Sequence, residues 1–351
     1  MKFSSFSSKD LSYSMRLDGS YHLSDAVVFE KAIIQKSYSR LSTLTDRIFS
    51  AGRNRRIYTS AEHGYPYLSN SDVIAQNPFA NCKYSSKRYG YEEDALLKAG
   101  MIVTGRVGAI GQTAFITSEF EEKKAMGSDN IIRIVAKDSK MQGFLYSFLA
   151  SKYGKTFLWK YAAGGVQPYI NEAMVGSIPV PIFPPDKQQQ THDLITQSAD
   201  LRVEANRLLE EAIKLFEKSL PDIKINNTFT TSINLISRNN LRLDSTTNYA
   251  NIQSFYKEVS SEYELRSIES LSAKVFTPNI FKRMRVKDPS AGIPFLSGSD
   301  LLDSMPKFES YLSKKMKNLN DYILKYGWVA IQDSGTIGYI SLINGFLDGV
   351  A

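Results

Sequence analysis

Three regularly spaced glycines are candidates for a chemical role. Gly105, Gly108 and Gly111 are three residues apart, a spacing that suggests a phosphate-binding loop. The spacing is not the G-x-G-x-x-G of dinucleotide-binding loops, and no Gly-Lys-Ser/Thr sequence follows. A turn that needs a positive φ explains Gly108 and Gly111 better than a phosphate site does.

Other signatures of catalysis are incomplete. Residues 77–79 (Asn-Pro-Phe) are half of the Asn-Pro-Pro-aromatic motif of amino-methyltransferases, and residues 221–222 (Pro-Asp) lack the Asp/Glu-x-Lys that completes a nuclease motif. Cys82 is the only cysteine, which excludes a disulfide or a Cys-rich zinc site within the chain. The histidines have no metal-ligand spacing; they are His22, His63 and His192. We therefore expect no catalytic residue, no metal site and no bound cofactor on this chain.

The composition is typical of a folded protein with an anionic partner. The 351 residues are 42% hydrophobic and 23% charged, enough apolar material for two or three cores. The 43 Lys and Arg against 36 Asp and Glu give a net charge of +7, which favours nucleic acid as the partner. The N-terminus lacks a secretion signal and no segment has the length of a membrane span, so we expect no membrane association and a cytoplasmic location.

The sequence repeats itself once, at an offset of about 227 residues. This period is far too long for a solenoid and indicates a duplicated domain. The second copy stops earlier in its pattern than the first, so we expect a truncated second domain or a fragment. The matching segments are 16–18 with 242–244 (Arg-Leu-Asp), 44–49 with 271–276, 64–74 with 292–302, and 100–111 with 327–338.

Basic residues in four groups are candidate DNA contacts. Two groups occupy the same place in the two copies, directly after the strand predicted at 44–49 and its counterpart, which suits phosphate positioning. A third alternates with tyrosines, and a single arginine faces Asp333 in the other copy; such differences suit two domains that read different bases. A solvated charged loop is the alternative for the paired groups, while Gln167 and Tyr169 stay open between a structural role and a contact. The candidates are Arg53, Arg55, Arg56, Lys83, Lys87, Arg88, Arg106, Lys282, Arg283 and Arg285.

The elements that would position these residues follow from the hydrophobic pattern. β-Branched residues predict strands at 102–104, 114–117 and 131–135. An apolar face predicts one helix over 140–161. Four prolines in residues 178–185 exclude a helix there and favour polyproline-like geometry.

Residues 186–220 are the strongest helix in the sequence. Asp186 is predicted to cap it, with Gln189 in the capping-box position, and Pro221 ends it. Leucines recur at every seventh position with small residues between them, which is a coiled-coil seam; a bundle core helix is the alternative. At 1.5 Å per residue the helix is about 50 Å long, enough to hold two DNA readers one turn of about 34–36 Å apart. The interface leucines are Leu194, Leu201, Leu208 and Leu215.

The ordered set of motifs resembles the specificity subunit of Type I restriction-modification systems over nearly the whole chain. Its most specific part is the end of the first copy, before the long helix. The segments that carry the resemblance are 16–18 before Tyr21, 64–68 and 292–296 (Gly-x-Pro-aromatic-Leu), 164–170 (Gly-Gly-Val-Gln-Pro-Tyr-Ile), 178–181 (Ile-Pro-Val-Pro) and 184–188 (Pro-Pro-x-x-Gln).

The resemblance implies an α+β fold with two similar α/β target-recognition domains in tandem, separated by a long coiled-coil-type spacer helix. The domains would be 1–185 and 221–351, the second incomplete, with the helix at 186–220. Each domain would bind half of a split site in double-stranded DNA. The helix would set the spacing and dock methyltransferase (modification) subunits carrying S-adenosylmethionine, beside a restriction or motor subunit using ATP and Mg.

Two alternatives remain open. A related bifunctional system uses a similar subunit with a fused nuclease-methyltransferase. From a different class, a truncated half-subunit could act as an adaptor whose helix is the functional part. Because the second spacer helix is missing, we expect the leucine row to self-associate or to need its modification partner.

Overall fold

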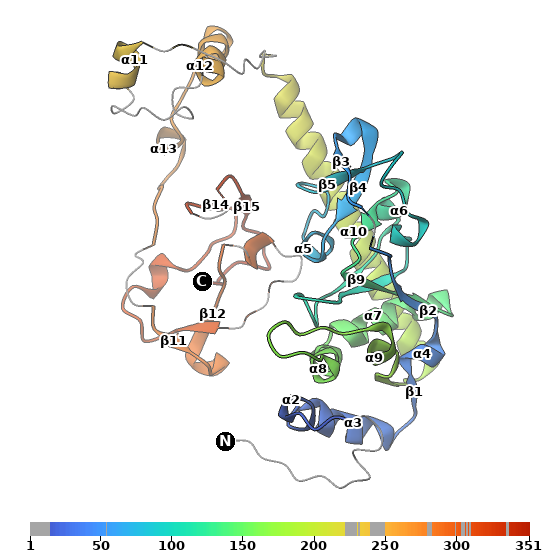
Figure 1. The fold of residues 1–351 in the computed structure, drawn as a ribbon. Coiled ribbons are helices and arrows are strands. Elements are labelled where there is room, and N and C mark those ends of the chain that lie inside the picture. The colour runs from blue at the N-terminus through green and yellow to red at the C-terminus, as the bar shows by residue number, and fades with distance from the viewer. Residues whose placement is uncertain are drawn as a thin grey trace. The chain divides into compact units, whose positions relative to one another are not determined.

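A computed structural model gives the fold, which mixes helices and strands (Figure 1). The chain divides into two compact units, one formed mainly by residues before Arg207 and the other mainly by residues after it. No helix in the described part is long and apolar enough to cross a membrane. The residues that the structure describes are 15–53, 55–221, 230, 232–238, 250–278, 283–298, 300–302, 306, 308, 310–334 and 337–351.

The elements up to the end of the long helix alternate short helices with short strands. In chain order they are α2 (Gly19–His22), α3 (Ala26–Ile34), β1 (Tyr38–Arg40), α4 (Leu41–Leu44), β2 (Thr45–Ser50), β3 (Tyr58–Thr59), η1 (Ala61–His63), β4 (Gly64–Leu68), α5 (Asn70–Ile74), β5 (Lys83–Ser86), η2 (Glu93–Ala95), β6 (Ile102–Gly105), β7 (Thr113–Phe115), α6 (Ser118–Glu122), β8 (Met126–Gly127), β9 (Ile131–Ala136), η3 (Ser139–Met141), α7 (Gln142–Ala150), α8 (Lys152–Tyr161), α9 (Glu172–Gly176), β10 (Pro179–Pro181) and α10 (Pro185–Lys218).

Strands β2, β9, β6 and β7 form a four-stranded antiparallel sheet in that order. Successive side chains of a strand point to opposite faces, and here both faces are buried. Ile102 joins a core with helices α7 and α8, while Val103 joins a second core with Leu68 of β4 and Phe120 of α6. The strands predicted from β-branched residues are confirmed as β6, β7 and β9.

A second sheet has the order β3-β5-β4-β8. Strand β4 pairs antiparallel with β5, so that Tyr67 lies opposite Lys83 and Tyr65 opposite Ser85. Strand β8 continues the sheet parallel to β4. The loops 51–57 and 128–130 connect this small sheet to the larger one, because they join β2 to β3 and β8 to β9.

The prediction of one helix over 140–161 is wrong, because Ser151 divides it into α7 and α8. Ser151 has an extended ψ of 166°, accepts a hydrogen bond from the Gly154 N–H, and donates one to the Phe148 carbonyl. The two helices pack so closely that a Cβ on Gly154 would lie 2.3 Å from the carbonyl oxygen of Phe148. An N-cap serine and a small residue thus permit a turn that the apolar spacing alone does not reveal.

Residues 178–184 are extended, as predicted, and residues 179–181 form a strand rather than free polyproline geometry, whereas Pro185 already begins a helix. Strand β10 pairs antiparallel with β1, with Val180 opposite Ser39. The pairing joins the N-terminal segment to the end of the domain. Val180 is fully buried, which explains why the proline-rich segment is ordered against its neighbours.

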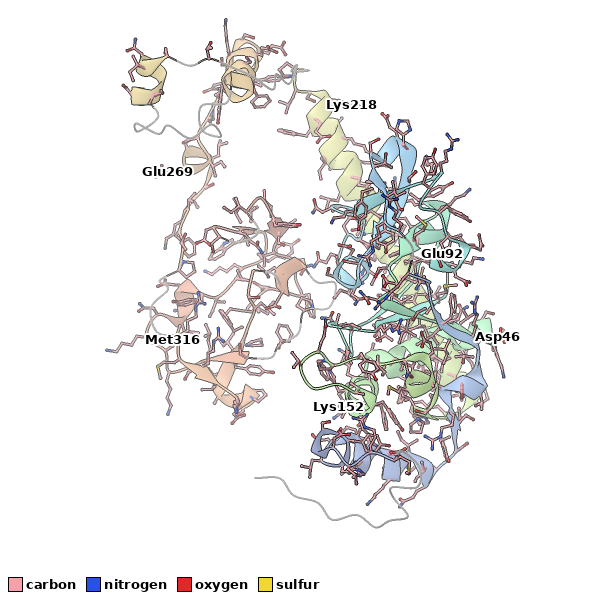
Figure 2. All side chains as sticks on the ribbon, viewed as in Figure 1. Asp46, Glu92, Lys152, Lys218, Glu269 and Met316 are labelled. Carbon is pink, nitrogen blue, oxygen red and sulfur yellow. The ribbon has the colours of Figure 1, made fainter. Side chains whose placement is uncertain are left out.

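Helix α10 begins at Pro185. The prediction that Asp186 caps the helix is therefore wrong, because Asp186 already lies inside it. The carbonyl of Pro184 accepts the N–H groups of Lys187 and Gln188, and Asp186 lies in the first turn, where a negative charge complements the helix dipole. Its first half packs on α7, where a Cβ on Gly143 would lie 2.8 Å from the Cα of His192. The helix ends at Lys218 (Figure 2).

The elements after the long helix are short. They are α11 (Ile233–Arg238), α12 (Ala250–Glu262), α13 (Ile268–Leu271), β11 (Arg285–Val286), η4 (Pro289–Ala291), β12 (Gly292–Phe295), η5 (Asp300–Leu302), β13 (Ser310–Ser313), η6 (Leu319–Asp321), β14 (Val329–Ile331) and β15 (Ile340–Leu342). Strands β11, β13 and β12 form an antiparallel sheet in that order, and β14 pairs with β15.

Several of these pairings have the same pattern as pairings in the first unit. The order β11-β13-β12 matches β3-β5-β4, and Phe295 lies opposite Ser310 as Tyr67 lies opposite Lys83. The β14-β15 hairpin matches β6-β7 in the same way. The sequence repeat therefore corresponds to repeated local structure at these strands, whereas residues 272–276, the counterpart of β2, form no strand.

Candidate nucleic-acid interface

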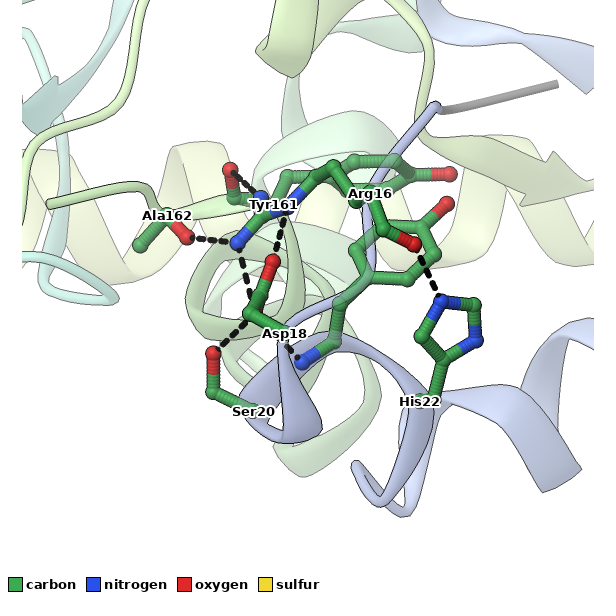
Figure 3. Close-up of polar contacts among 7 residues, drawn as sticks. Arg16, Asp18, Ser20, His22, Tyr161 and Ala162 are labelled. Atoms are coloured by element: carbon green, nitrogen blue, oxygen red, sulfur yellow. Dashed lines mark hydrogen bonds and ion pairs between the residues drawn. The ribbon is translucent and has the colours of Figure 1, made fainter. Parts of the chain in front are cut away.

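The Arg-Leu-Asp motif near the N-terminus fixes the structure locally (Figure 3). The Arg16 guanidinium donates to the carbonyls of Tyr161 and Ala162, at 2.9 and 2.8 Å, which lie at the C-terminal end of α8. It also pairs with Asp18, whose side chain caps α2 by accepting from the Tyr21 N–H. The Arg16 hydrogen bond and the cap hold the pKa of the Asp18 carboxyl far below its usual value. The repeat of this motif at 242–244 lies outside the described residues.

The predicted basic loop between β2 and β3 is organised by one buried carboxylate. Asp129 accepts from Arg56 at 2.6 Å, and the Nε of Arg53 lies 3.5 Å from its other oxygen. The same hydrogen bond raises the pKa of Arg56. Arg55 is exposed, and no ion pair to the described residues is found for it. The three arginines form one cluster in the sequence, but their environments in the structure differ.

One face of the small sheet joins this loop to the third predicted group. Arg56 lies over the ring of Tyr67 at 5.7 Å, Tyr67 contacts Tyr58 edge to face at 6.1 Å, and Lys83 lies over Tyr58 at 4.9 Å. Burial raises the pKa of Tyr67, which keeps its hydroxyl neutral. We call the residues Arg56, Tyr58, Tyr65, Tyr67 and Lys83 the basic-aromatic face.

The rest of the third group borders the same face. Lys87 lies over Tyr65 at 5.5 Å and donates to the Glu62 carbonyl at 2.9 Å. Arg88 is exposed beside Tyr89, at 5.1 Å from the ring. The tyrosines of β4 were missed in the sequence, although their alternation in Gly-Tyr-Pro-Tyr is the signal that places both on one face.

Arg106 lies close to the basic loop through its backbone. Its N–H donates to the Asn130 carbonyl at 2.8 Å, and its carbonyl accepts from Ile170 at 2.9 Å. The Asn130 contact brings the β6-β7 turn against residues 128–130, which carry Asp129. The side chain of Arg106 is half-buried. Arg106 and the Arg53–Arg56 loop are thus brought to one edge of the first unit.

A buried arginine that the sequence does not single out supports residues 128–130 from inside. Arg133 is fully buried and donates to the carbonyls of Gly127, Ile131 and Ala95 at 2.6, 2.8 and 2.9 Å. Burial lowers its pKa to about 10, which leaves it charged at neutral pH. Its carbonyl partners flank Asp129, so Arg133 fixes the loop that presents this carboxylate.

The segment 163–169 forms a tight loop at the same edge. Ala163 and Tyr169 exchange two backbone hydrogen bonds of 2.8 Å, and Gly164 has a φ of +98° that favours glycine. Val166 at the tip is fully exposed, and Gln167 beside it is exposed. Tyr169 therefore closes the base of the loop, whereas Gln167 faces solvent.

The second basic group is seen in part. Arg283 and Arg285 each lie 5.2 Å from the ring of Phe295, the residue that matches Tyr67. Lys282 lies outside the described residues. Basic side chains beside an aromatic ring of the Gly-x-Pro-aromatic strand thus occur in both copies.

The leucine row of α10 has no cover within the first unit. Its four members have exposed fractions of 52–70%, while the opposite side of the helix, with Ile195 and Val203, faces the domain. Asn206 makes the last contact of this side, donating to the Gln76 carbonyl at 2.9 Å. The leucines are Leu194 and Leu201, Leu208 and Leu215.

The arrangement offers hydrogen-bond donors and ring faces rather than reacting groups. Among the described residues no cluster of His, Cys, Asp and Glu could hold a metal ion. Burial raises the pKa of Cys82, which disfavours a reactive thiolate. Gly108 and Gly111 have φ values of +82° and +81°, consistent with the predicted turn. Guanidinium and ammonium groups over tyrosines fit phosphates and base edges of nucleic acid.

Comparison with known proteins places part of this structure in a family. Residues 45–215 match the model of the Type I restriction modification DNA specificity domain. No curated protein matches the sequence at a significant level.

Three solved structures have loose similarity to the chain. A chain of a type I R-M system is 14% identical with a TM-score of 0.36, covering 52% of this chain and 43% of that one. The HsdS subunit from Thermoanaerobacter tengcongensis is 15% identical with a TM-score of 0.35, covering 48% and 39%. The Type-I restriction-modification system S subunit from M. genitalium is 13% identical with a TM-score of 0.34, covering 90% and 68%.

The present chain spans about two fifths of the first two structures. At these TM-scores the superpositions add nothing to the family match. The match to the Type I restriction modification DNA specificity domain thus spans residues 45–215, from β2 into α10, just under half of the chain.

Proposed function

We propose that this chain is the non-catalytic DNA-recognition subunit of a Type I restriction-modification complex, acting on double-stranded DNA in the cytoplasm. The observation that carries the proposal is the basic-aromatic face, in a chain with a net charge of +7. Charged groups at and beside this face, such as Lys83 and Arg55, would position the DNA backbone, and the loops at the adjoining edge would contact base edges. We propose residues 1–185 as the first recognition domain.

Two readers in tandem would suit a bipartite target. Residues 221–351 are proposed as the second, incomplete domain. The pairing of Arg283 and Arg285 with Phe295 supports it, because the same strand of the first copy carries Tyr67 beside Arg56. Unequal residues at matching places, such as Arg106 and Asp333, would let the two domains select different bases.

The long helix would set the distance between the two readers and dock modification subunits. Its 34 residues give a length of about 51 Å. The exposed leucine row supports docking, since a regular apolar row on a helix is best buried by another helix. We propose a modification subunit, or the helix of a second copy, as its cover.

Chemistry would reside on partner subunits, with S-adenosylmethionine on the modification subunits and ATP with Mg on a restriction or motor subunit. We expect the purified chain neither to methylate nor to cut DNA. A specificity subunit of a related bifunctional system would have the same structure but a fused nuclease-methyltransferase partner. An adaptor that acts only through the leucine row would show no salt-dependent DNA binding.

Selection from a randomised DNA duplex tests the proposal. The full chain is expected to enrich two short sequence blocks at a fixed separation and to bind more weakly as salt is raised. Salt-independent binding without an enriched sequence would contradict DNA recognition and favour the adaptor.

A further inference from the structure

We propose that Arg56, held in place by Asp129, selects a guanine in the major groove of the target DNA. This inference rests on the proposed function and adds a specificity-determining residue to it. It also changes the expectation from sequence, in which Arg53, Arg55 and Arg56 together position phosphates.

The guanidinium of Arg56 is fixed on two sides. One Nη donates to Asp129 at 2.6 Å, and the guanidinium lies 5.7 Å from the centre of the Tyr67 ring, whose hydroxyl also bonds to it. The Asp129 side chain is only 10% exposed, so it cannot swing away with the arginine into solvent. An arginine has five N–H donors, so even after these two bonds three remain for a ligand.

A guanidinium held in a fixed position suits the two acceptors of guanine. In the major groove guanine presents two acceptors, O6 and N7, and a bidentate arginine is the commonest specific contact to them. The side chain of Arg56 is 45% exposed, so its free donors can reach a base edge. Because the guanidinium is already held in place before DNA binds, less side-chain entropy is lost on binding.

The charges around Arg56 favour a base over a phosphate as its ligand. Asp129 partly neutralises Arg56 and Arg53, and its own negative charge would repel a phosphate brought to the same place. Arg55 has no such carboxylate partner among the described residues and is fully available for a phosphate. Arg56 is thus suited to base selection, and Arg55 is suited to attracting the DNA backbone.

The loop that carries the Asp129 carboxylate is itself held in place. The buried Arg133 binds the carbonyls of Gly127 and Ile131 on either side of Asp129, and the Asn130 carbonyl is held by the N–H of Arg106. A rigid loop beneath the pair is what a specific contact needs, since small displacements of the fork would misalign both hydrogen bonds.

Site selection with matched variants of the full chain tests the proposal. The duplex has a randomised core, and the variants are Arg56→Ala, Arg56→Lys, Asp129→Asn and Arg55→Ala, each checked by thermal unfolding. Wild type is expected to select a G·C pair that both Arg56 variants no longer select, with binding to the wild-type sequence weakened about tenfold to a hundredfold. Asp129→Asn should weaken selection at the same base pair.

Arg56→Lys is the sharpest variant, because it keeps the charge and removes the fork. Its salt dependence should stay that of the wild type, whereas Arg55→Ala should keep the selected sequence and flatten the salt slope by about 0.9. An unchanged selected sequence in Arg56→Ala, or full guanine selection by Arg56→Lys, would overturn the inference while leaving DNA recognition intact. If wild type selects no sequence, the proposed function fails and this inference with it.

Discussion

Arginine side chains have two kinds of environment in the first unit. Arg16 and Arg133 donate to backbone carbonyls of distant segments and hold these segments together, whereas Arg53 and Arg56 share the carboxylate of Asp129 at the surface. The first kind stabilises the fold because it supplies hydrogen bonds to backbone carbonyls of two different segments. The second kind orients charged groups toward solvent, where a ligand can reach them.

Replacing Arg16 by alanine tests its structural role. The carbonyls of Tyr161 and Ala162 would lose a charged donor, and α8 would lose its tie to the N-terminal segment. We expect the free energy of unfolding to fall by about 1.5–3 kcal/mol in denaturant titrations. Arg55→Ala, at an exposed position, is the control and should change it by less than about 0.5 kcal/mol. Equal stability of the two variants would contradict the role given to Arg16.

The same contact predicts a dependence on pH. The folded pKa of Asp18 lies below its ordinary value of 3.8, so its contribution is complete above about pH 4 and is lost as the pH falls further. Without Arg16 the depression of this pKa should shrink. The stability of the Arg16→Ala variant should therefore decline less steeply than that of wild type below about pH 4. If the stability of the two proteins declined in parallel, Arg16 would not be lowering the pKa of Asp18.

For single residues, the sequence predicts where basic side chains cluster better than it predicts which groups they bind. The basic loop and the basic-tyrosine segment are visible as clusters of neighbouring residues. Asp129 is 73 residues from Arg56 along the chain, and only the fold brings the two together. Arg133 is hidden in a strand of isoleucines, where nothing local indicates that its guanidinium binds loop carbonyls.

Among the elements, the long helix is predicted most accurately. Its heptad of leucines sets both its type and its exposed side, and Pro221 places its end within a few residues. The helix predicted at 140–161 fails because apolar periodicity continues across the N-cap Ser151. The proline-rich segment is extended, as the sequence predicts, but its pairing with β1 depends on residues far away in the sequence.

Alanine at both Leu201 and Leu208 tests the function of the helix. Because these side chains are 63% and 52% exposed, the change should leave the unfolding temperature of the first unit nearly unchanged. If another helix covers them, each truncation should cost about 2–5 kcal/mol of the association free energy. Sedimentation should then show loss of self-association or of the complex with the modification subunit. Lys214→Ala on the same helix is the control.

A monomeric wild type whose partner binding is the same as that of the double variant would contradict the assignment of this helix as a docking spacer. Retained association in the double variant but not in a variant of Ile195 and Val203 would instead place the interface on the side that faces the domain.

On the scale of the whole molecule, we propose that the chain determines which DNA sequence a larger enzyme modifies. The family match covers residues 45–215, and the pairing of strands recurs after the long helix. The repeat can be detected in the sequence because it preserves residue order at a nearly constant offset. The target could not, since it depends on which side chains meet each base in a complex.

A genome-wide map of DNA methylation, in cells with and without this gene, measures that claim most directly. We expect one motif of two blocks with a fixed gap to be methylated only when the gene is present. Restoring the gene as Arg56→Ala should broaden that motif at one G·C pair. Identical maps in the two strains, with the modification subunits present in both, would contradict the account.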